Sequence, residues 1–327
     1  MDVAPFDRVL RRIPAIGVGT LAGDQIEMAG LGTIGDALDP GALRWEIGSI
    51  TKVFTGILLA EMSVRGEVGL DDPIGRFAPA EVANRLPASD HQPTLTDLAT
   101  HTAGLPRIPL AWMRRIRGSG DPYALLTEDD VWDVLGPKMA RPRKQKMRYS
   151  NYGVGLLGHL LARAAGTTYE ALVAERILAP LGMTATSAGG ADPMPGFRKK
   201  RPTPPWNFGA LAGAGALRST LPDMLTFATA CIDPPSGTLG AALDLAREPV
   251  CRGRFGISGM GLGWHVRPTP PRRLRGTVWH NGGTYGGASF VAVNPTLRVA
   301  AVTFGNAGPR VMSPLDGPSW RLFDQLT

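Results

Sequence analysis

Ser49 and Lys52 are the residues whose types and spacing first indicate chemistry, in the segment 45–56 that reads WEIGSITKVFTG. A serine hydroxyl is a weak nucleophile and needs a base within hydrogen-bonding reach. Residues three apart on a helix lie on one face, so the amine of Lys52 can lie beside the hydroxyl of Ser49. The helix dipole and burial both disfavour an ammonium at a helix start. We therefore expect a neutral Lys52 that can take the proton of Ser49.

The backbone at the start of this helix adds a second catalytic element. The first N–H groups of a helix have no partner inside the helix, so the amide of Ser49 is free to donate to an oxyanion. One helical turn would then supply a nucleophile, a base and half of an oxyanion hole. Ser-x-x-Lys also occurs by chance or as an exposed pair on a helix, so further motifs are needed to decide.

Two further segments place polar residues where elements are expected to start or turn. The segment 149–151 reads Tyr-Ser-Asn and opens a helix, where Asn151 can cap the helix and offer its amide to a substrate carbonyl. The segment 280–283 reads His-Asn-Gly-Gly in a predicted strand, where the glycines let the backbone approach a ligand closely.

In this combination the chain resembles the serine β-lactamase and penicillin-binding-protein superfamily, in the branch of class C β-lactamases, D-alanyl-D-alanine carboxypeptidases and esterases. The three motifs of the superfamily follow in the same order, as Ser49 and Lys52, then Tyr149 and Asn151, then His280 and Gly282. The resemblance also covers the segments 95–106, 211–227 and 280–295 and so spans nearly the whole chain.

The resemblance implies that Ser49 is acylated and that Lys52 and Tyr149 act as a coupled pair that carries its proton. Asn151 would hold the amide on the acyl side of the substrate, and His280 and Gly282 would also contact the substrate. The amides of Ser49 and Gly283 would form the oxyanion hole. We expect a small-molecule acyl substrate, no cofactor and no metal, and we leave the oligomeric state open.

The third motif departs from the family pattern in a way that bears on the substrate. β-Lactamases of this branch have Lys-Thr-Gly where this chain has His-Asn-Gly, so an imidazole that is mostly neutral at pH 7 replaces a fixed cation. We expect poor turnover of penicillins and cephalosporins. We also expect protonation of His280 below pH ~6.5 to favour acidic substrates.

The segment before Tyr149 departs as well, because the usual Pro-Gly is Pro142-Arg143 here. Side chains alternate along an extended segment, which predicts that Met147 shares a face with Tyr149. The opposite face would be basic and solvated, with Lys144, Lys146 and Arg148.

The motifs leave the acyl donor and the acceptor open. A hydrolase and an acyltransferase that uses an amine or an alcohol share every motif, and the donor can be an ester, an amide, a D-peptide or a thioester. We favour an esterase, amidase or transacylase over a true β-lactamase. A catalytically silent binding protein on the same scaffold is the alternative of another class, and the intact Ser49, Lys52 and Tyr149 argue against it.

Composition is typical of a globular protein, with 43% hydrophobic and 19% charged residues. The apolar runs are shorter than the ~18 residues of a membrane span. Acidic residues at positions 2 and 7, and the lack of an apolar core after a basic start, predict no secretory signal and a cytoplasmic protein. Cys231 and Cys251 lack Cys-x-x-Cys spacing, which predicts two buried thiols rather than a disulfide framework or a zinc site.

The net charge is +7, and the excess is clustered in the runs 141–148, 198–201 and 272–275. Such runs usually lie on solvated loops or strand faces, and no zinc finger, RNP-type segment or basic zipper accompanies them, so we expect no nucleic-acid partner. An acidic substrate is compatible with this charge.

The match of the segment 153–158 to Gly-x-Gly-x-x-Gly lies inside a predicted helix and indicates close helix packing. His101 and His159 are expected to be structural.

Strand-like segments lie at both ends of the chain and helical segments in the middle. The predicted strands are 13–22, 25–32, 261–266, 276–282, 288–294 and 298–306, and the predicted helices are 6–12, 49–65, 94–101, 127–135, 151–165, 168–178, one that starts at 220, and 314–326. We therefore expect an α/β (α+β) fold in which both chain ends form a mainly antiparallel sheet flanked by terminal helices. As a single domain, 1–327 would comprise an α/β lobe of about 1–48 and 255–327, a helical lobe of about 49–254, and a catalytic cleft between the lobes.

Overall fold

A computed structural model describes residues 1–33, 39–116, 118–139, 146–190, 192–254, 257–268, 274–308 and 313–327. Pro142, Arg143 and Lys144 lie outside the described residues, as do the first two positions of the basic run 272–275.

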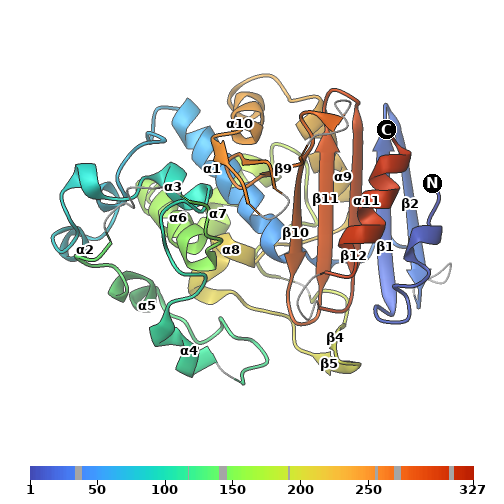
Figure 1. The fold of residues 1–327 in the computed structure, drawn as a ribbon, viewed down its shortest axis with the longest axis horizontal. Coiled ribbons are helices and arrows are strands. Elements are labelled where there is room, and N and C mark those ends of the chain that lie inside the picture. Colours follow the sequence, from blue (N-terminus) through green and yellow to red (C-terminus); the bar gives the residue numbers. More distant parts are fainter. Residues whose placement is uncertain are drawn as a thin grey trace.

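An eight-stranded antiparallel sheet forms one side of the molecule (Figure 1). Its strand order is β2-β1-β12-β11-β10-β9-β8-β7. The strands are β1 (Ala15–Ala22), β2 (Gln25–Gly32), β7 (Cys251–Arg252), β8 (Gly259–Met260), β9 (His265–Val266), β10 (Val278–Gly283), β11 (Ala288–Asn294) and β12 (Val299–Gly305). Strand β1 pairs with β12, with Ile16 opposite Gly305, so the two chain ends build one sheet as predicted.

Helices cover both faces of the central strands. Every residue of β11 and β12 is buried, which matches their near-continuous runs of alanine, valine and phenylalanine. Helix α11 (Asp316–Gln325) lies on one face, and α9 (Leu221–Ile232) contacts β1, β11 and β12 from the other (Figure 1). The sheet thus separates two hydrophobic clusters, a small one under α11 and a large one that extends into the helical side.

The helical side is built around α1 (Thr51–Val64). All of its residues from Thr51 to Met62 are buried, and it contacts α6, α8 and α10. A helix that is buried on nearly every side lies in the protein interior, where neighbouring elements cover it. The other helices are α2 (Ala80–Ala83), α3 (Leu95–Ala99), α4 (Leu110–Ile116), α5 (Glu128–Asp133), α6 (Asn151–Ala164), α7 (Tyr169–Val173), α8 (Ala212–Gly215) and α10 (Thr238–Arg247).

Several predicted elements differ from the structure. The predicted helix 6–12 is wrong: the chain forms a 3-10 turn, Ala4–Phe6, followed by further turns. The predicted helix 168–178 changes after α7 into a π-helical turn, Ala174–Leu178. The helices α4 and α10, and the small hairpin of β4 (Gly196–Arg198) and β5 (Arg201–Thr203), are additional.

The glycines of the segment 153–158 have the packing role that the sequence predicted. A Cβ on Gly155 would lie 2.4 Å from a methyl of Leu211, and one on Gly158 would lie 3.3 Å from the Cα of Gly213. The glycines therefore let α6 approach α8 and the turn that precedes it.

The division into two lobes stays a prediction. Helix α9 belongs by sequence to the range 49–254, yet it packs on the sheet. Among the described residues, no helix has both the length and the apolar character that crossing a membrane requires.

Candidate active site

Ser49 lies in a 3-10 turn, Gly48–Ile50, that runs directly into α1. Gly48 has a φ of +48°, in the left-handed region that favours glycine. A Cβ at this position would lie 2.8 Å from the backbone nitrogen of Gly283. Glycine therefore allows the turn that carries Ser49 to sit against the end of β10.

Lys52 lies beside Ser49, as the three-residue spacing predicted. Its Nζ donates to Ser49 Oγ at 3.0 Å and to the carbonyl of Ala214 at 2.6 Å. The side chain is only 1% exposed. Burial, followed by the charge of Arg107, holds the pKa of Lys52 well below its usual value. A neutral Nζ has a lone pair that can accept the Ser49 proton, while the Ala214 carbonyl holds it in place.

Tyr149 reaches the same hydroxyl from the segment before α6. Burial raises the pKa of Tyr149 to about 12, while a hydrogen bond with Ser49 and the charge of Arg107 act in the opposite direction. The phenol is therefore protonated at neutral pH and can donate a proton. Its ring lies against that of His101, with centroids 4.4 Å apart. Met147 is buried and Lys146 and Arg148 are exposed, which agrees with the predicted alternation.

Arg107 is a member of the site that the sequence reasoning missed. Its guanidinium lies 5.5 Å from the centroid of the Tyr149 ring, and its side chain is exposed. Its charge lowers the pKa of both Lys52 and Tyr149. The only signal in the sequence is its position, because it directly follows the segment 95–106 that resembles the family.

Asn151 is the first residue of α6, and Ser150, not Asn151, caps that helix. Ser150 Oγ accepts from the amide of Gly153 at 2.8 Å, which leaves the Asn151 side chain free for other contacts. Asn151 Nδ2 donates to the hydroxyl of Tyr123 at 2.9 Å. Its buried Oδ1 has no partner among the described residues, so it can accept a hydrogen bond from a substrate amide.

Gly282 and Gly283 end β10 next to Ser49. The amide of Thr284 donates to the carbonyl of Gly287 at 2.9 Å. Hydrogen-bonded and non-hydrogen-bonded pairs of residues alternate along two antiparallel strands. Because Thr284 and Gly287 form a hydrogen-bonded pair, the next pair, Gly283 and Ala288, does not, so the N–H of Gly283 points away from β11. It lies on the side of Gly48. A Cβ on Gly282 would lie 2.1 Å from the carbonyl oxygen of Ile47, so this strand needs glycine to pass the start of the Ser49 turn. The geometry thus places the amide of Gly283 beside the turn of Ser49.

His280 does not titrate near pH 6.5, and that part of the sequence interpretation is wrong. The side chain is fully buried, and Nδ1 donates to the carbonyl of Asn281 at 2.6 Å. Its ring stacks on that of His265 at 4.3 Å and lies 6.4 Å from that of Tyr149. Burial, then the neighbouring His265 and Lys52, hold the pKa of His280 well below its usual value. The imidazole is a neutral part of the wall behind Tyr149.

His101 supports Tyr149 from the other side and has the structural role expected from the sequence. It adopts a φ of +61°, and its Nδ1 accepts from the amide of Ser150 at 3.2 Å. Its carbonyl accepts from the amide of Arg148 at 2.7 Å. These two bonds fix the backbone on both sides of Tyr149, so the ring is held in place before any substrate binds.

An aromatic wall continues the site beyond Asn151. The ring of Trp206 contacts those of Tyr123 and Tyr285, with centroids 5.3 and 4.7 Å apart. Glu46 ties this wall to β10, because it accepts from the amide of Trp206 at 2.7 Å and from the hydroxyl of Thr284 at 2.9 Å. Burial raises the pKa of Glu46.

The chain is similar in sequence to proteins of a known family. The family described as Beta-lactamase matches residues 22–323. "Beta-lactamase-like protein 2" of Dictyostelium discoideum is 34% identical over 155 residues, which are 43% of this chain and 25% of that protein. The "D-alanyl-D-alanine-carboxypeptidase/endopeptidase AmpH" of Escherichia coli (strain K12) is 28% identical over 284 residues, 80% of this chain and 71% of that protein.

A solved structure shares the fold over nearly the whole length. It is a β-lactamase/D-alanine carboxypeptidase from Yersinia pestis complexed with citrate, with a TM-score of 0.82 and 23% identity. The match covers 99% of this chain and 98% of that chain. With a family match over most of its length, the chain belongs to the beta-lactamase family of serine hydrolases.

Proposed function

We propose that this enzyme forms a covalent acyl-enzyme on Ser49 and then passes the acyl group to water, or to an amine or alcohol. The observation that carries the proposal is the contact of Ser49 Oγ with Lys52 Nζ at 3.0 Å, in a buried setting that holds the pKa of Lys52 well below its usual value. A nucleophile within reach of a poised base is the usual requirement for acyl transfer.

The proposed reaction follows from the positions of these groups. Ser49 Oγ attacks the substrate carbonyl as its proton moves to Lys52, and the amides of Ser49 and Gly283 bind the oxyanion. The leaving group takes a proton from Tyr149, which recovers one from Lys52. The acceptor then attacks the acyl-enzyme and gives its proton to the same pair. The bond between the acyl group and Ser49 Oγ breaks, and the pair returns that proton to Ser49. Asn151 Oδ1 would orient the acyl side of the substrate.

We propose simple esters or amides as better substrates than β-lactams. His280 stands at the third motif, where the resembling β-lactamases have a lysine, and it is buried and neutral. It therefore offers no charge to a penicillin carboxylate. Hydrolysis and transfer share the first step, so the acceptor decides between them.

Intact-mass spectrometry with p-nitrophenyl esters and with penicillin G tests the proposal. We expect the mass of one acyl group on the wild type with the esters and none with Ser49→Ala, and little or slow adduct with penicillin G. The control is Ser63→Ala, at the far end of α1, which should behave as wild type. A Ser49→Ala variant that keeps more than about a thousandth of wild-type kcat would contradict a covalent role.

Two added reagents separate the finer alternatives. If butanol diverts the acyl group into a butyl ester at a constant total rate, transfer competes with hydrolysis. Efficient turnover of nitrocefin at neutral pH would instead show that the enzyme is a β-lactamase proper, and the ester preference would be wrong.

A further inference from the structure

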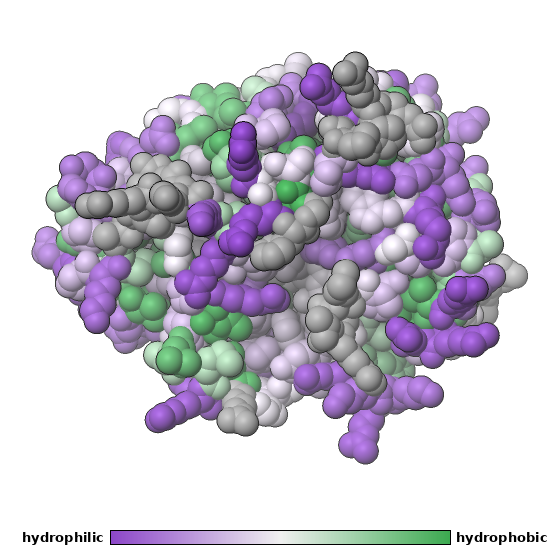
Figure 2. All heavy atoms as spheres, viewed as in Figure 1, coloured by the Kyte–Doolittle hydropathy of each residue, from purple (hydrophilic) through white to green (hydrophobic). Residues whose placement is uncertain are grey.

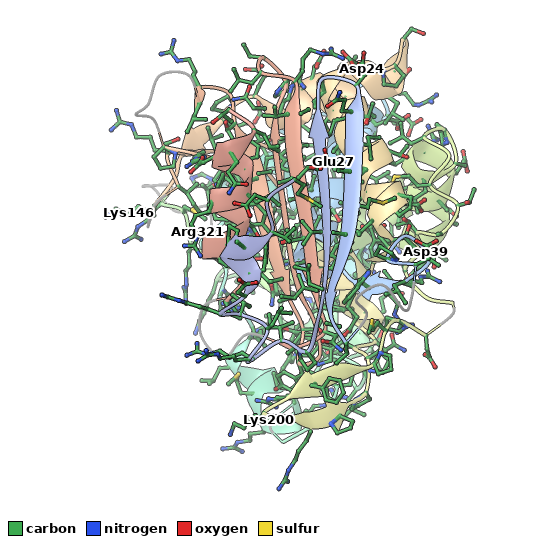
Figure 3. All side chains as sticks on the ribbon, turned by 90° about the vertical axis from the view of Figure 1, so that its right-hand side faces the viewer. Asp24, Glu27, Asp39, Lys146, Lys200 and Arg321 are labelled. Atoms are coloured by element: carbon green, nitrogen blue, oxygen red, sulfur yellow. The ribbon has the colours of Figure 1, made fainter. Side chains whose placement is uncertain are left out.

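A pocket of about 820 Å³ lies outside the acyl site, near the ends of the central strands where β4 and β5 project (Figure 1). Its walls are the N-terminal segment 11–14, the β4–β5 hairpin, Tyr285, and the residues Ala307, Gly308 and Pro314. Figure 3 shows Lys200 at the tip of this hairpin. The volume lies in the range of small-molecule sites, about 300–1,000 Å³.

The pocket is strongly basic. No carboxylate is found among the described residues of its lining. Five cationic side chains line it: Arg11, Arg12, Arg198, Lys199 and Lys200. In the part of the chain that the structure describes, none of the five forms an ion pair. Figure 2 shows hydrophilic side chains gathered at the same lower edge of the molecule. A concave surface lined by one sign of charge concentrates the field and attracts ions of the other sign.

The β4–β5 hairpin has cationic residues at positions where other residue types would be more favourable. Lys199 and Lys200 form a two-residue turn with φ values of +52° and +65°. Such a turn favours Asn-Gly, because side chains with a Cβ are strained at positive φ. Arg198 also lies directly opposite Arg201, and like charges in that position repel. Strain of this kind is typical of functional segments.

Apolar groups complete the pocket. Ile13, Phe197 and Ala307 line it together with the ring of Tyr285. The guanidinium of Arg198 lies 3.6 Å from the centroid of that ring, which holds the cation at the pocket wall. We propose that this pocket binds a small organic molecule that carries two or more negative charges beside an apolar body.

The pocket adjoins the acyl site through one residue. Tyr285 follows Gly283 by two positions, so their Cα atoms are at most about 7 Å apart. Trp206 contacts Tyr285 on one side and Tyr123, the partner of Asn151, on the other. The proposed binding needs no chemistry at Ser49, so it can be tested independently of the proposed acyl-enzyme.

Isothermal titration with naphthalene-1,5-disulfonate tests the proposal at constant ionic strength, in wild type and in Ser49→Ala. We expect one site per chain in both proteins. The double variant K199N/K200G should weaken binding at least about tenfold, the effect of losing ~1.4 kcal/mol. Its melting temperature should not fall, since Asn-Gly suits this turn. Weakened binding therefore cannot be attributed to unfolding.

The control variant K138Q/K146Q removes the same charge from exposed lysines that do not line the pocket, and Lys146 lies apart from Lys200 in Figure 3. It should bind as wild type. Equal weakening in both double variants, or none in K199N/K200G, would overturn the proposal.

Three comparison ligands define the chemistry. Sodium sulfate and neutral 1-naphthalenemethanol should each bind at least about tenfold more weakly than the disulfonate. Sulfate that binds as well as the disulfonate would reduce the pocket to a simple anion site and overturn the proposed ligand class. Binding to anionic phospholipid vesicles without binding of the disulfonate would show a membrane contact surface instead.

Discussion

At the scale of single residues, two basic side chains and one imidazole set the state of the acyl site. Lys52 is buried and Arg107 is exposed, and burial followed by the positive charge of Arg107 lowers the pKa of Lys52. Burial raises the pKa of Tyr149 to about 12, so its phenol is protonated at neutral pH, and the proposed reaction assigns the role of base to Lys52. Arg107 favours the neutral form of Lys52 because its positive charge disfavours a proton on the Lys52 amine.

Arg107→Gln should move the acidic limb of the kcat/KM profile to higher pH. In the proposed reaction Lys52 must be neutral to accept a proton. Removal of the Arg107 charge should raise the pKa of Lys52, so its protonation should begin at a higher pH. A pH series with a neutral p-nitrophenyl ester measures the limb. Arg107→Lys keeps the charge and should leave the limb near its wild-type position. A limb that stays in place in Arg107→Gln would show that this charge does not control the base.

His280 should leave the choice between acidic and neutral esters independent of pH. Burial holds the pKa of His280 well below its usual value, so the imidazole carries no charge near neutral pH. The ratio of kcat/KM for a carboxylate-bearing and a neutral ester cancels the titration of Lys52, and we expect a flat ratio. His280→Gln cannot titrate and should be equally flat. A rise toward the acidic ester near pH 6.5 that disappears in this variant would contradict the burial argument.

At the scale of elements, the site is held by turns and helix starts. The 3-10 turn of Ser49, the capped start of α6 and the end of β10 each contribute one polar group or amide. The turn depends on Gly48, whose backbone lies against Gly283.

Gly48→Ala should lower kcat by about 10²–10³, the usual effect of losing one oxyanion donor. The added Cβ would meet the Gly283 nitrogen at 2.8 Å and push the two amides apart. Gly66→Ala is a matched control at the other end of α1, because Gly66 also has a positive φ, +75°, but no atom lies within 4 Å of its Cβ position. Both variants should lose about 1–2 kcal/mol of stability from strain. Equal loss of kcat in both would contradict a local effect on the oxyanion hole.

The sequence predicted the elements that have a strong local pattern. The hairpin 13–32, the strands near the C-terminus and the helices predicted at 49–65 and 151–165 follow from periodicity, turn glycines and caps. The first of these helices begins at Thr51, after the 3-10 turn of Ser49. The motifs also identified Ser49, Lys52, Tyr149 and Asn151, which the structure brings together, while their catalytic roles stay predictions. Local pattern could not identify Arg107 or the burial of His280, because both depend on contacts between distant segments.

At the scale of the whole molecule, the sheet separates two hydrophobic clusters that pack against different elements. The large cluster includes α1 and so supports Ser49, whereas the small cluster lies beneath α11. Damage to the small cluster should therefore affect stability more than chemistry.

Phe323→Ala should lower the free energy of unfolding by about 3–5 kcal/mol, as expected for a fully buried phenylalanine. Urea denaturation measures this loss. The kcat of the folded fraction should stay at its wild-type value, because the phenylalanine belongs to the cluster that excludes α1. Leu110→Ala, at a side chain that is 85% exposed, should change stability by no more than about 0.5 kcal/mol. A fall in kcat that parallels the loss of stability in Phe323→Ala would show that the two cores are coupled.

The pairing of β1 with β12 has a consequence for synthesis. Ile16 is opposite Gly305, so the first strand leaves the ribosome without the neighbour that it has in the finished sheet. At about 5–20 residues per second, the wait between these two positions is roughly 15–60 seconds. During that time the exposed edge of the β1–β2 hairpin is open to other chains. Gly283 emerges late as well, so the nascent enzyme holds its serine long before the oxyanion site exists.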